Sequence, residues 1–312
     1  MKDVDLRVRL GRLELANPVL VAAGTFGYGI EFERAVRLEA LGGIITKTIT
    51  LAPRQGNPPP RLADTPSGML NSVGLQNVGL EAFLSEKLPK LAALPVPVIV
   101  SVLGESLDDV RTLCATLNGQ PAVAAIELNL SCPNLKRGQG LEDGGRMVAQ
   151  DPDETFAVVQ AARAGTTKPL IAKLSPDVTD LRPVAQAAER AGAEALSLCN
   201  TFTGMSLDPH TRRSRLGSLT GGLGGPAIRP LAVYRVWQVH QAVRCPLIGL
   251  GGILHAEDAV EFFLAGASAV AVGTANFADP RAALRVLDGI RRHLRREGLS
   301  SVQELTGTLQ TA

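Results

Sequence analysis

The hexapeptide Asn129-Leu130-Ser131-Cys132-Pro133-Asn134 is the segment of this sequence best suited to carry out chemistry. It follows the mostly apolar run Val123–Leu128, which is typical of a buried β-strand. A cysteine flanked by side-chain amides and followed by a proline is unusual for an inert core position. Cys132 has three interpretations: a buried thiol, a covalent nucleophile, or a general base. No histidine lies near it in the sequence, but a partner could come from elsewhere in the fold.

Two lysines end apolar runs elsewhere in the chain. Lys47 closes the run that starts at Gly42, and Lys173 closes the run Pro169–Ala172. A lysine at the tip of a buried strand is costly unless it meets an anion or another partner, although a snorkelling stem or an ion pair would also explain one such residue. Only seven of the 32 basic residues are lysines, so two at strand ends favour a functional role.

Glycine-rich and amide-rich segments supply further candidates. Two of these segments, Gly249–Ile253 and Val272–Ala275, lie late in the chain. They are either tight turns or loops that hold a phosphate on backbone N–H groups near a helix N-terminus. Their positions after the last two predicted strands favour a phosphate site. Asn71–Asn77 offers the donors and acceptors that a planar ring with carbonyl and N–H groups needs, although turn chemistry also explains a single asparagine. Gly222–Ala227 matches a dinucleotide-binding pattern formally, but it contains a proline and follows no clear strand, so we interpret it as a flexible glycine loop.

Short apolar runs that suit parallel strands alternate with amphipathic stretches throughout the sequence. The predicted strands are Val19–Ala22, Gly43–Lys47, Val98–Val102, Ala124–Asn129, Leu170–Lys173, Ala195–Cys199, Leu247–Leu250 and Ala269–Val272. The predicted helices are Glu31–Leu41, Gly79–Leu94, Leu107–Leu117, Asp153–Ala164, Leu181–Ala191, Ala227–Val243, Ala256–Ala265 and Pro280–Glu297.

About eight such βα units predict an α/β protein with a (β/α)8 TIM barrel, and a doubly wound sheet is the alternative. No linker is visible, so we expect residues 1–312 to form a single domain. Two long loops, Thr48–Val78 and Asn200–Gly225, follow carboxyl ends of strands, the face where such barrels carry their active sites.

Composition excludes several classes of function. A net charge of +2 and 4% aromatic residues argue against a nucleic-acid partner. The four cysteines are far apart, without CxxC, and no HExxH is present, so we expect reduced thiols and no metal site. The N-terminus is polar and no apolar run approaches the length of a membrane span, which predicts a cytoplasmic protein without membrane contact.

Together these segments resemble class 1 dihydroorotate dehydrogenases over nearly the whole chain. The matching motifs are Asn17-Pro18, Lys47-Thr48, Gly56-Asn57-Pro58, Asn71 to Asn77, Asn129 to Asn134, Lys173-Leu174-Ser175-Pro176, Asn200-Thr201, Gly221 to Pro226, Gly251-Gly252 and Gly273 to Phe277. Gly74-Leu75-Gln76-Asn77, a cysteine at position 132 and the lack of a membrane segment resemble the form that uses NAD through a partner subunit.

The resemblance implies an FMN-containing barrel that oxidises dihydroorotate to orotate, with Cys132 as the base that removes the C5 proton while the C6 hydride passes to the flavin. Lys173 would lie near the pyrimidine edge of the flavin, where negative charge develops on reduction. The residues expected to contact substrate are Lys47, Asn71, Ser72, Val73, Gly74, Leu75, Asn129, Asn200 and Thr201. The residues expected to contact FMN are Ala23, Lys47, Thr48, Ser101, Asn129, Lys173 and Cys199, with Gly225, Gly251, Gly252, Gly273 and Thr274 at its phosphate.

The resemblance also implies partners. FAD and a 2Fe–2S cluster would sit on an electron-transfer subunit, and the catalytic chain would form a homodimer, or a heterotetramer with that subunit. Two departures from the family pattern are Ser101, where an asparagine is usual, and the segment Gly138–Gly145 after the cysteine. The alternatives are a fumarate-reducing homodimer, a phosphate-binding lyase or aldolase that uses Lys47 or Lys173 as a Schiff-base amine, and a non-catalytic barrel.

Overall fold

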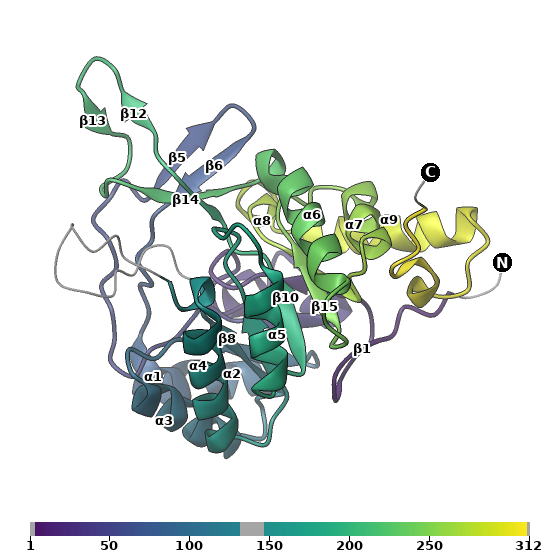
Figure 1. Cartoon of the computed structure of the whole chain (residues 1–312), viewed down its shortest axis with the longest axis horizontal. Coiled ribbons are helices and arrows are strands. Elements are labelled where there is room, and N and C mark those ends of the chain that lie inside the picture. The colour runs from purple at the N-terminus through teal and green to yellow at the C-terminus, as the bar shows by residue number, and fades with distance from the viewer. Residues whose placement is uncertain (1–3, 132–146, 311–312) are drawn as a thin grey trace.

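A closed barrel of eight parallel strands forms the centre of the protein, whose computed structural model describes residues 4–131 and 147–310 (Figure 1). Each strand pairs with the next one along the chain, and the last pairs with the first. The barrel strands are β3 (Val19–Val21), β4 (Gly43–Ile45), β7 (Val98–Val102), β8 (Ala125–Asn129), β9 (Leu170–Lys173), β10 (Ala195–Leu198), β15 (Leu247–Leu250) and β16 (Ala269–Val272). This confirms the predicted TIM barrel.

The barrel strands are short and buried along their whole length. Continuous burial explains why the sequence shows apolar runs instead of the alternation expected for a half-exposed sheet. All eight predicted strands are present, and their bounds differ from the prediction by two residues at most.

Helices surround the barrel, as Figure 1 shows for α4, α5 and α6. The α-helices are α1 (Gly79–Ala82), α2 (Leu88–Ala92), α3 (Leu107–Asn118), α4 (Pro152–Gly165), α5 (Arg182–Arg190), α6 (Arg229–His240), α7 (Ala256–Leu264), α8 (Ala275–Ala278) and α9 (Ala282–Arg296), and a π-helical turn at Phe83–Lys87 joins α1 to α2. Short 3-10 turns lie at Ile30–Phe32, Leu38–Ala40, Val148–Gln150, Pro226–Ile228 and Val302–Leu305. No helix in the described ranges is long and apolar enough to cross a membrane.

The predicted helix Glu31–Leu41 is wrong. Two 3-10 turns, Ile30–Phe32 and Leu38–Ala40, stand in its place, and Arg37 between them leaves the helical region with ψ 88°. Phe32 stacks on Phe26 with ring centroids 4.2 Å apart. Packing of individual apolar side chains against the barrel therefore overrides the local helical pattern here.

The two long segments predicted as loops form a second, smaller sheet. Its antiparallel strands are β5 (Leu62–Thr65) and β6 (Gly68–Asn71) from the first segment, and β11 (Phe202–Gly204) and β14 (Gly221–Gly224) from the second. Their order is β11-β14-β6-β5, so β6 and β14 join the two segments. A hairpin, β12 (Leu207–Asp208) and β13 (Arg213–Ser214), projects beyond this sheet (Figure 1), and another, β1 (Val8–Leu10) and β2 (Leu13–Leu15), lies near the N-terminus.

The interpretation of Gly222–Ala227 as a flexible loop is also wrong, because Gly221–Gly224 is strand β14. The glycines are required by close neighbours: a Cβ on Gly222 would lie 2.0 Å from Thr201 Oγ1, and one on Gly224 would lie 2.7 Å from Thr274 Oγ1. Glycine has a low propensity for strands, so the sequence gives little sign of β14. The same residue lets the strand lie close to the side chains of Thr201 and Thr274.

Candidate active site

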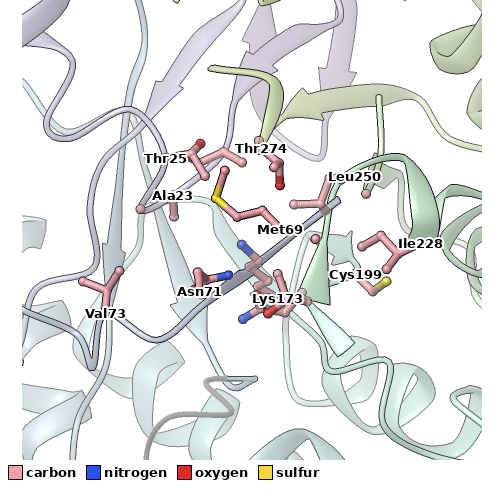
Figure 2. Close-up of a pocket in the computed structure, with 18 of the residues that line it drawn as sticks. Ala23, Thr25, Met69, Asn71, Val73, Lys173, Cys199, Ile228, Leu250 and Thr274 are labelled. Atoms are coloured by element: carbon pink, nitrogen blue, oxygen red, sulfur yellow. Dashed lines mark hydrogen bonds between the residues drawn. The ribbon is translucent and has the colours of Figure 1, made fainter. Parts of the chain in front are cut away.

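A cavity lies between the carboxyl ends of the barrel strands and the small sheet, and its empty space, including the open mouth, is about 1120 Å³. Its walls come from both long segments and from the ends of most barrel strands. In Figure 2, Lys173 occupies the middle of the labelled group, with Asn71 on one side and Cys199 and Ile228 on the other. Side chains that are far apart in the sequence therefore face one space.

Most of the predicted site residues line this cavity. They are Ala23, Lys47, Thr48, Asn71, Val73, Gly74, Leu75, Asn129, Lys173, Cys199, Asn200, Thr201, Gly225, Gly251, Gly252, Gly273 and Thr274. Ser72 and Ser101 are buried beside the cavity and do not line it. Cys132, Asn134 and the segment Gly138–Gly145 lie outside the described residues.

The two lysines reach the cavity from the ends of β4 and β9, which β7 and β8 separate in the barrel, as the strand-end positions predict. Lys173 is the last residue of β9 and is only 5% exposed, and its ammonium forms no hydrogen bond or ion pair with the described residues. Lys47 follows β4, where burial and the nearby Arg61 lower its pKa while Glu31 opposes this effect. Both cations are therefore available to an anionic group in the cavity.

A chain of hydrogen bonds runs from the interior of the barrel to the cavity floor. The hydroxyls of Ser101 and Thr48 lie 2.9 Å apart, and Asn129 Nδ2 donates to Thr48 Oγ1 at 3.1 Å. Ser101 is fully buried and therefore positions Thr48 and Asn129 from below instead of facing a ligand. A serine at this position is compatible with an intact cavity, because its short side chain completes the chain of hydrogen bonds.

Asn200 holds the residue that precedes the candidate catalytic cysteine. Its Nδ2 donates to the carbonyl oxygen of Ser131 at 2.8 Å and to Ser131 Oγ at 3.0 Å, and its Oδ1 accepts from the backbone N–H of Thr201 at 2.8 Å. The segment after β8 is thus tied to the segment after β10. Ser131 immediately precedes Cys132 in the sequence, so Asn200 fixes the backbone one residue before the candidate catalytic cysteine.

The small sheet supplies the opposite wall. Asn71 on β6 donates through Nδ2 to the carbonyl oxygen of Gly222 on β14 at 3.0 Å. Ser72, next to it, accepts from Asn57 Nδ2 at 2.7 Å and from Ser218 Oγ at 2.6 Å. Ser72 therefore joins three loop segments and supports the wall from behind.

Backbone conformation is specialised on this wall and at the glycine loops. Gly74 and Leu75 have φ angles of 70° and 56°, and leucine rarely adopts the left-handed region. On the opposite side, Gly251 and Gly252 have φ angles of 127° and 77°, and a Cβ on Gly252 would lie 2.8 Å from the carbonyl oxygen of Gly225. These glycine loops present backbone instead of side chains to the cavity.

The cysteines in the described part of the chain are poor nucleophiles. Burial raises the pKa of Cys199, which lines the cavity, to about 12, although Arg235 and Lys173 oppose the increase. Burial likewise raises the pKa values of Cys114 and Cys245 to about 12. A thiolate is the reactive form of cysteine, so these three thiols stay inert near neutral pH.

The sequence interpretation missed several residues that line the cavity: Ala22, Gly24, Thr25, Met69, Gly224, Ile228, Leu250 and Phe277. Ala22, Gly24 and Thr25 directly follow the first barrel strand, and that position was a usable signal. Met69 and Phe277 carry no such signal, because an apolar side chain looks the same in sequence whether it faces a core or a ligand.

Comparisons with known proteins agree with this geometry. A family model described as dihydroorotate dehydrogenase matches residues 5–294. A Geotalea daltonii protein named dihydroorotate dehydrogenase B (NAD(+)), catalytic subunit, is 51% identical over 310 residues, which cover 99% of this chain and 100% of the relative. A protein of the same name from Desulforudis audaxviator is 51% identical, and the match covers 97% of this chain and 97% of that protein. Another from Geobacter sulfurreducens is 49% identical, and the match covers 99% of this chain and 100% of that protein.

Proposed function

The chain belongs to the dihydroorotate dehydrogenase family, and on that premise we propose that it oxidises dihydroorotate to orotate in pyrimidine biosynthesis, using bound FMN. The observation that carries the proposal is the single cavity where two strand-end lysines, several side-chain amides and the glycine loops meet. Family membership favours this oxidation over a lyase or aldolase that would use either lysine as a Schiff-base amine.

The cavity suits FMN in the chemistry of its walls. The backbone N–H groups of Gly252 and Thr274 donate no hydrogen bond within the described part of the chain, and both residues line the cavity. Bare N–H groups at glycine loops are a recurring way to hold phosphate, so we assign the FMN phosphate to this side, with Gly225, Gly251 and Gly273.

The opposite side of the cavity provides the charged and amide groups. Bound FMN supplies the hydride acceptor for the oxidation. We assign Lys173 to the pyrimidine edge of the flavin and Asn129 and Thr48 to the floor beneath it, where Ser101 supports them. We also assign Ala23 and Cys199, which line the cavity, to flavin contact.

The substrate ring would lie between the floor and the small sheet. Amides offer both donors and acceptors to its carbonyl and N–H groups, which suits Asn71, Asn129 and Asn200. Lys47 can meet the substrate carboxylate, and Thr201 and the turn Val73–Leu75 close the wall, with Ser72 as support behind it. Binding on several sides orients the substrate and excludes water from it.

We assign the proton abstraction at C5 to Cys132. A free thiol has a pKa of about 8.5, so modest tuning makes it an effective base near neutral pH. Support comes from the inertness of Cys114, Cys199 and Cys245, whose buried thiols have raised pKa values. The hydrogen bonds from Asn200 to Ser131 also hold the start of the segment that carries Cys132 at the cavity.

We further propose that electrons pass to NAD through a partner subunit that carries FAD and a 2Fe–2S cluster. The relatives are named as catalytic subunits of an NAD(+) enzyme. Within the described ranges, no cluster of cysteine, histidine and acidic residues could hold a metal, which agrees with a cluster carried by the partner. The chain would act in the cytoplasm as one flavin-binding domain.

A homodimer, joined by the partner into a heterotetramer, is the assembly we propose. Large apolar side chains are exposed on the segment that runs along the small sheet and its hairpin: Met205, Leu207 and Leu219 are 48%, 54% and 61% exposed. Exposed apolar groups of this size favour contact with another protein. Size-exclusion chromatography with light scattering, with and without the partner, measures the assembly.

Anaerobic reduction by dihydroorotate tests the proposed reaction. The purified protein should be yellow, or become yellow on reconstitution with FMN, and dihydroorotate should bleach it. A colourless protein that fails to take up FMN would contradict the proposal. Reoxidation by fumarate and by NAD, each with and without the partner subunit, then separates the NAD-linked complex from the alternative fumarate-reducing homodimer.

A further inference from the structure

Glu127 is a carboxyl group buried in the interior of the barrel beneath the cavity. It lies on β8 with 0% of its surface exposed. Asn129, two residues later on the same strand, lines the cavity and pairs with Lys173 on β9. Side chains two residues apart on a strand point to the same side, so Glu127 faces the barrel interior one level below Asn129 and Lys173.

The carboxyl group of Glu127 lacks the hydrogen bonds that a buried acid normally forms. Neither of its oxygens forms a hydrogen bond of ordinary geometry within the described residues, and the same holds for Ser197 Oγ. The hydroxyls of Ser101 and Ser197 lie near enough to stabilise the carboxylate in part. A buried carboxyl group without such bonds needs a counter-charge or a proton.

Lys173 is the counter-charge. Burial raises the pKa of Glu127, and the positive charge of Lys173 is the largest effect that opposes the increase. The charge of Lys173 also acts on the nearby Cys199 thiol. Burial raises the pKa of Cys199 to about 12, so this thiol carries no charge near neutral pH. Among the described residues, the groups that act on Glu127 are therefore one cation, Lys173 on β9, and the uncharged hydroxyls of Ser101 on β7 and Ser197 on β10.

The charge state of Glu127 changes what Lys173 presents to the cavity. When Glu127 holds a proton, the ammonium charge faces the cavity uncompensated. When Glu127 is ionised, its negative charge cancels much of that field inside the low-dielectric barrel. Glu127 and Lys173 together therefore contribute to the electrostatic potential at the cavity floor.

We propose that Glu127 is a positioning residue that acts through Lys173 to set the reduction potential of the flavin. The inference rests on the proposed function, because it takes the flavin to occupy the cavity above Lys173. Reduction adds negative charge to the flavin, so a stronger positive field favours the reduced cofactor. Glu127 thus adds a pH dependence to the reduction potential of the flavin, because its proton belongs to the protein and not to the flavin.

The variant Glu127→Gln tests this directly, because glutamine has nearly the same shape and cannot ionise. The midpoint potential, measured by equilibration with a reference dye, should be higher in Glu127→Gln than in the wild type, and the difference should grow as pH rises. In the Lys173→Met background the carboxyl group loses its counter-charge and stays protonated, so Glu127→Gln should then produce no shift.

Equal potentials of wild type and Glu127→Gln at every pH would overturn the proposal, and so would a shift that persists in the Lys173→Met background. The matched control is Cys114→Ala, which alters a fully buried side chain in α3 away from the cavity. It should leave the potential unchanged, and thermal unfolding shows that each variant is folded.

An experiment on the flavin-free protein separates failure of this inference from failure of the proposed function. Infrared difference spectra detect the carbonyl stretch of a protonated carboxyl group that is absent from Glu127→Gln. This band should persist to higher pH in Lys173→Met than in the wild type, and an unchanged titration would overturn the coupling of the two residues. The proposed function fails instead if the wild type takes up no FMN or is not bleached by dihydroorotate.

Discussion

The two halves of the barrel interior differ in chemistry. On β7 to β10 the inward-facing positions include five polar residues among apolar ones: Ser101, Glu127, Asn129, Lys173 and Ser197. On β15, β16 and β3 they carry apolar and often small residues: Ile248, Leu250, Ala269, Ala271, Leu20 and Ala22. Both halves are buried, so the difference does not reflect access to solvent.

This contrast shows how one cavity can serve two purposes. In the proposed reaction the polar half would place side chains under the reacting part of the ligands, and each of these groups needs a partner because it is buried. The apolar half leads into Gly251, Gly252 and Gly273, which present backbone to the cavity. We expect changes in the polar half to affect chemistry and changes at the glycine loops to affect cofactor affinity.

The largest expected effect is that of Cys132→Ala, in the segment that follows the polar strand β8. Loss of the general base should lower kcat by roughly 10²–10⁴-fold while FMN content stays normal, as steady-state kinetics and flavin absorbance would measure. Cys245→Ala is the matched control, because its half-buried thiol is inert and lies outside the cavity, so kcat should stay near the wild-type value. Full turnover in Cys132→Ala would refute the assigned role.

Lys173→Met should have the next largest effect. Removal of a charged donor aimed at a site where charge develops typically lowers the rate by about 10²–10³-fold. Stopped-flow measurement of flavin reduction by dihydroorotate isolates this step from binding. If the reduction rate stays normal and only FMN affinity falls, Lys173 belongs functionally with the glycine loops, and the division into two halves fails.

Glu127→Gln should change how the stability of the protein depends on pH. The pKa of Glu127 is raised in the folded state, so the folded protein binds more protons than the unfolded chain between the two pKa values. The wild type therefore loses stability as pH rises through this window, by about 1.4 kcal/mol per pH unit at most, whereas the glutamine variant does not. Urea unfolding at several pH values should show that the free energy of unfolding of Glu127→Gln rises relative to that of the wild type as pH rises. The same pH dependence in both proteins would contradict the raised pKa.

Gly252→Ala should affect the apolar half instead. The new Cβ would lie 2.8 Å from the carbonyl oxygen of Gly225, at a φ of 77°. Strain of about 1–2 kcal/mol should weaken FMN binding roughly tenfold, as fluorescence titration would measure, with little change in the reduction rate of bound flavin. Gly119→Ala, where the nearest atom is 3.7 Å away, is the control and should bind FMN normally.

The smallest effect is expected for Ser101→Ala, which removes the hydrogen bond to Thr48 below the cavity floor. Loss of one buried hydrogen bond should lower the free energy of unfolding by about 1 kcal/mol. Ser85→Ala, on an exposed helical turn, should change it by less than about 0.5 kcal/mol. If both variants unfold alike in urea, Ser101 does not support the floor.

Much of the fold was predictable because its signals are local. Each barrel strand is a short apolar run, because a strand that is buried on both faces needs apolar residues at most of its positions. The strand-end lysines and the late glycine loops were visible for the same reason. The failures, at Glu31–Leu41 and in the two long segments, fall where contacts with distant residues decide the conformation.

The sequence by itself determined the barrel, the set of residues at the carboxyl ends of its strands and the family to which they belong, because apolar periodicity and motif order are properties of neighbouring residues. Only the tertiary structure decided that β6 pairs with β14 over the cavity, that Ser101 lies beneath Thr48, and that Glu127 lies buried one level below Lys173. These relations depend on the register with which the strands close the barrel. Register is set by packing across the whole interior, and no local pattern in the chain records it.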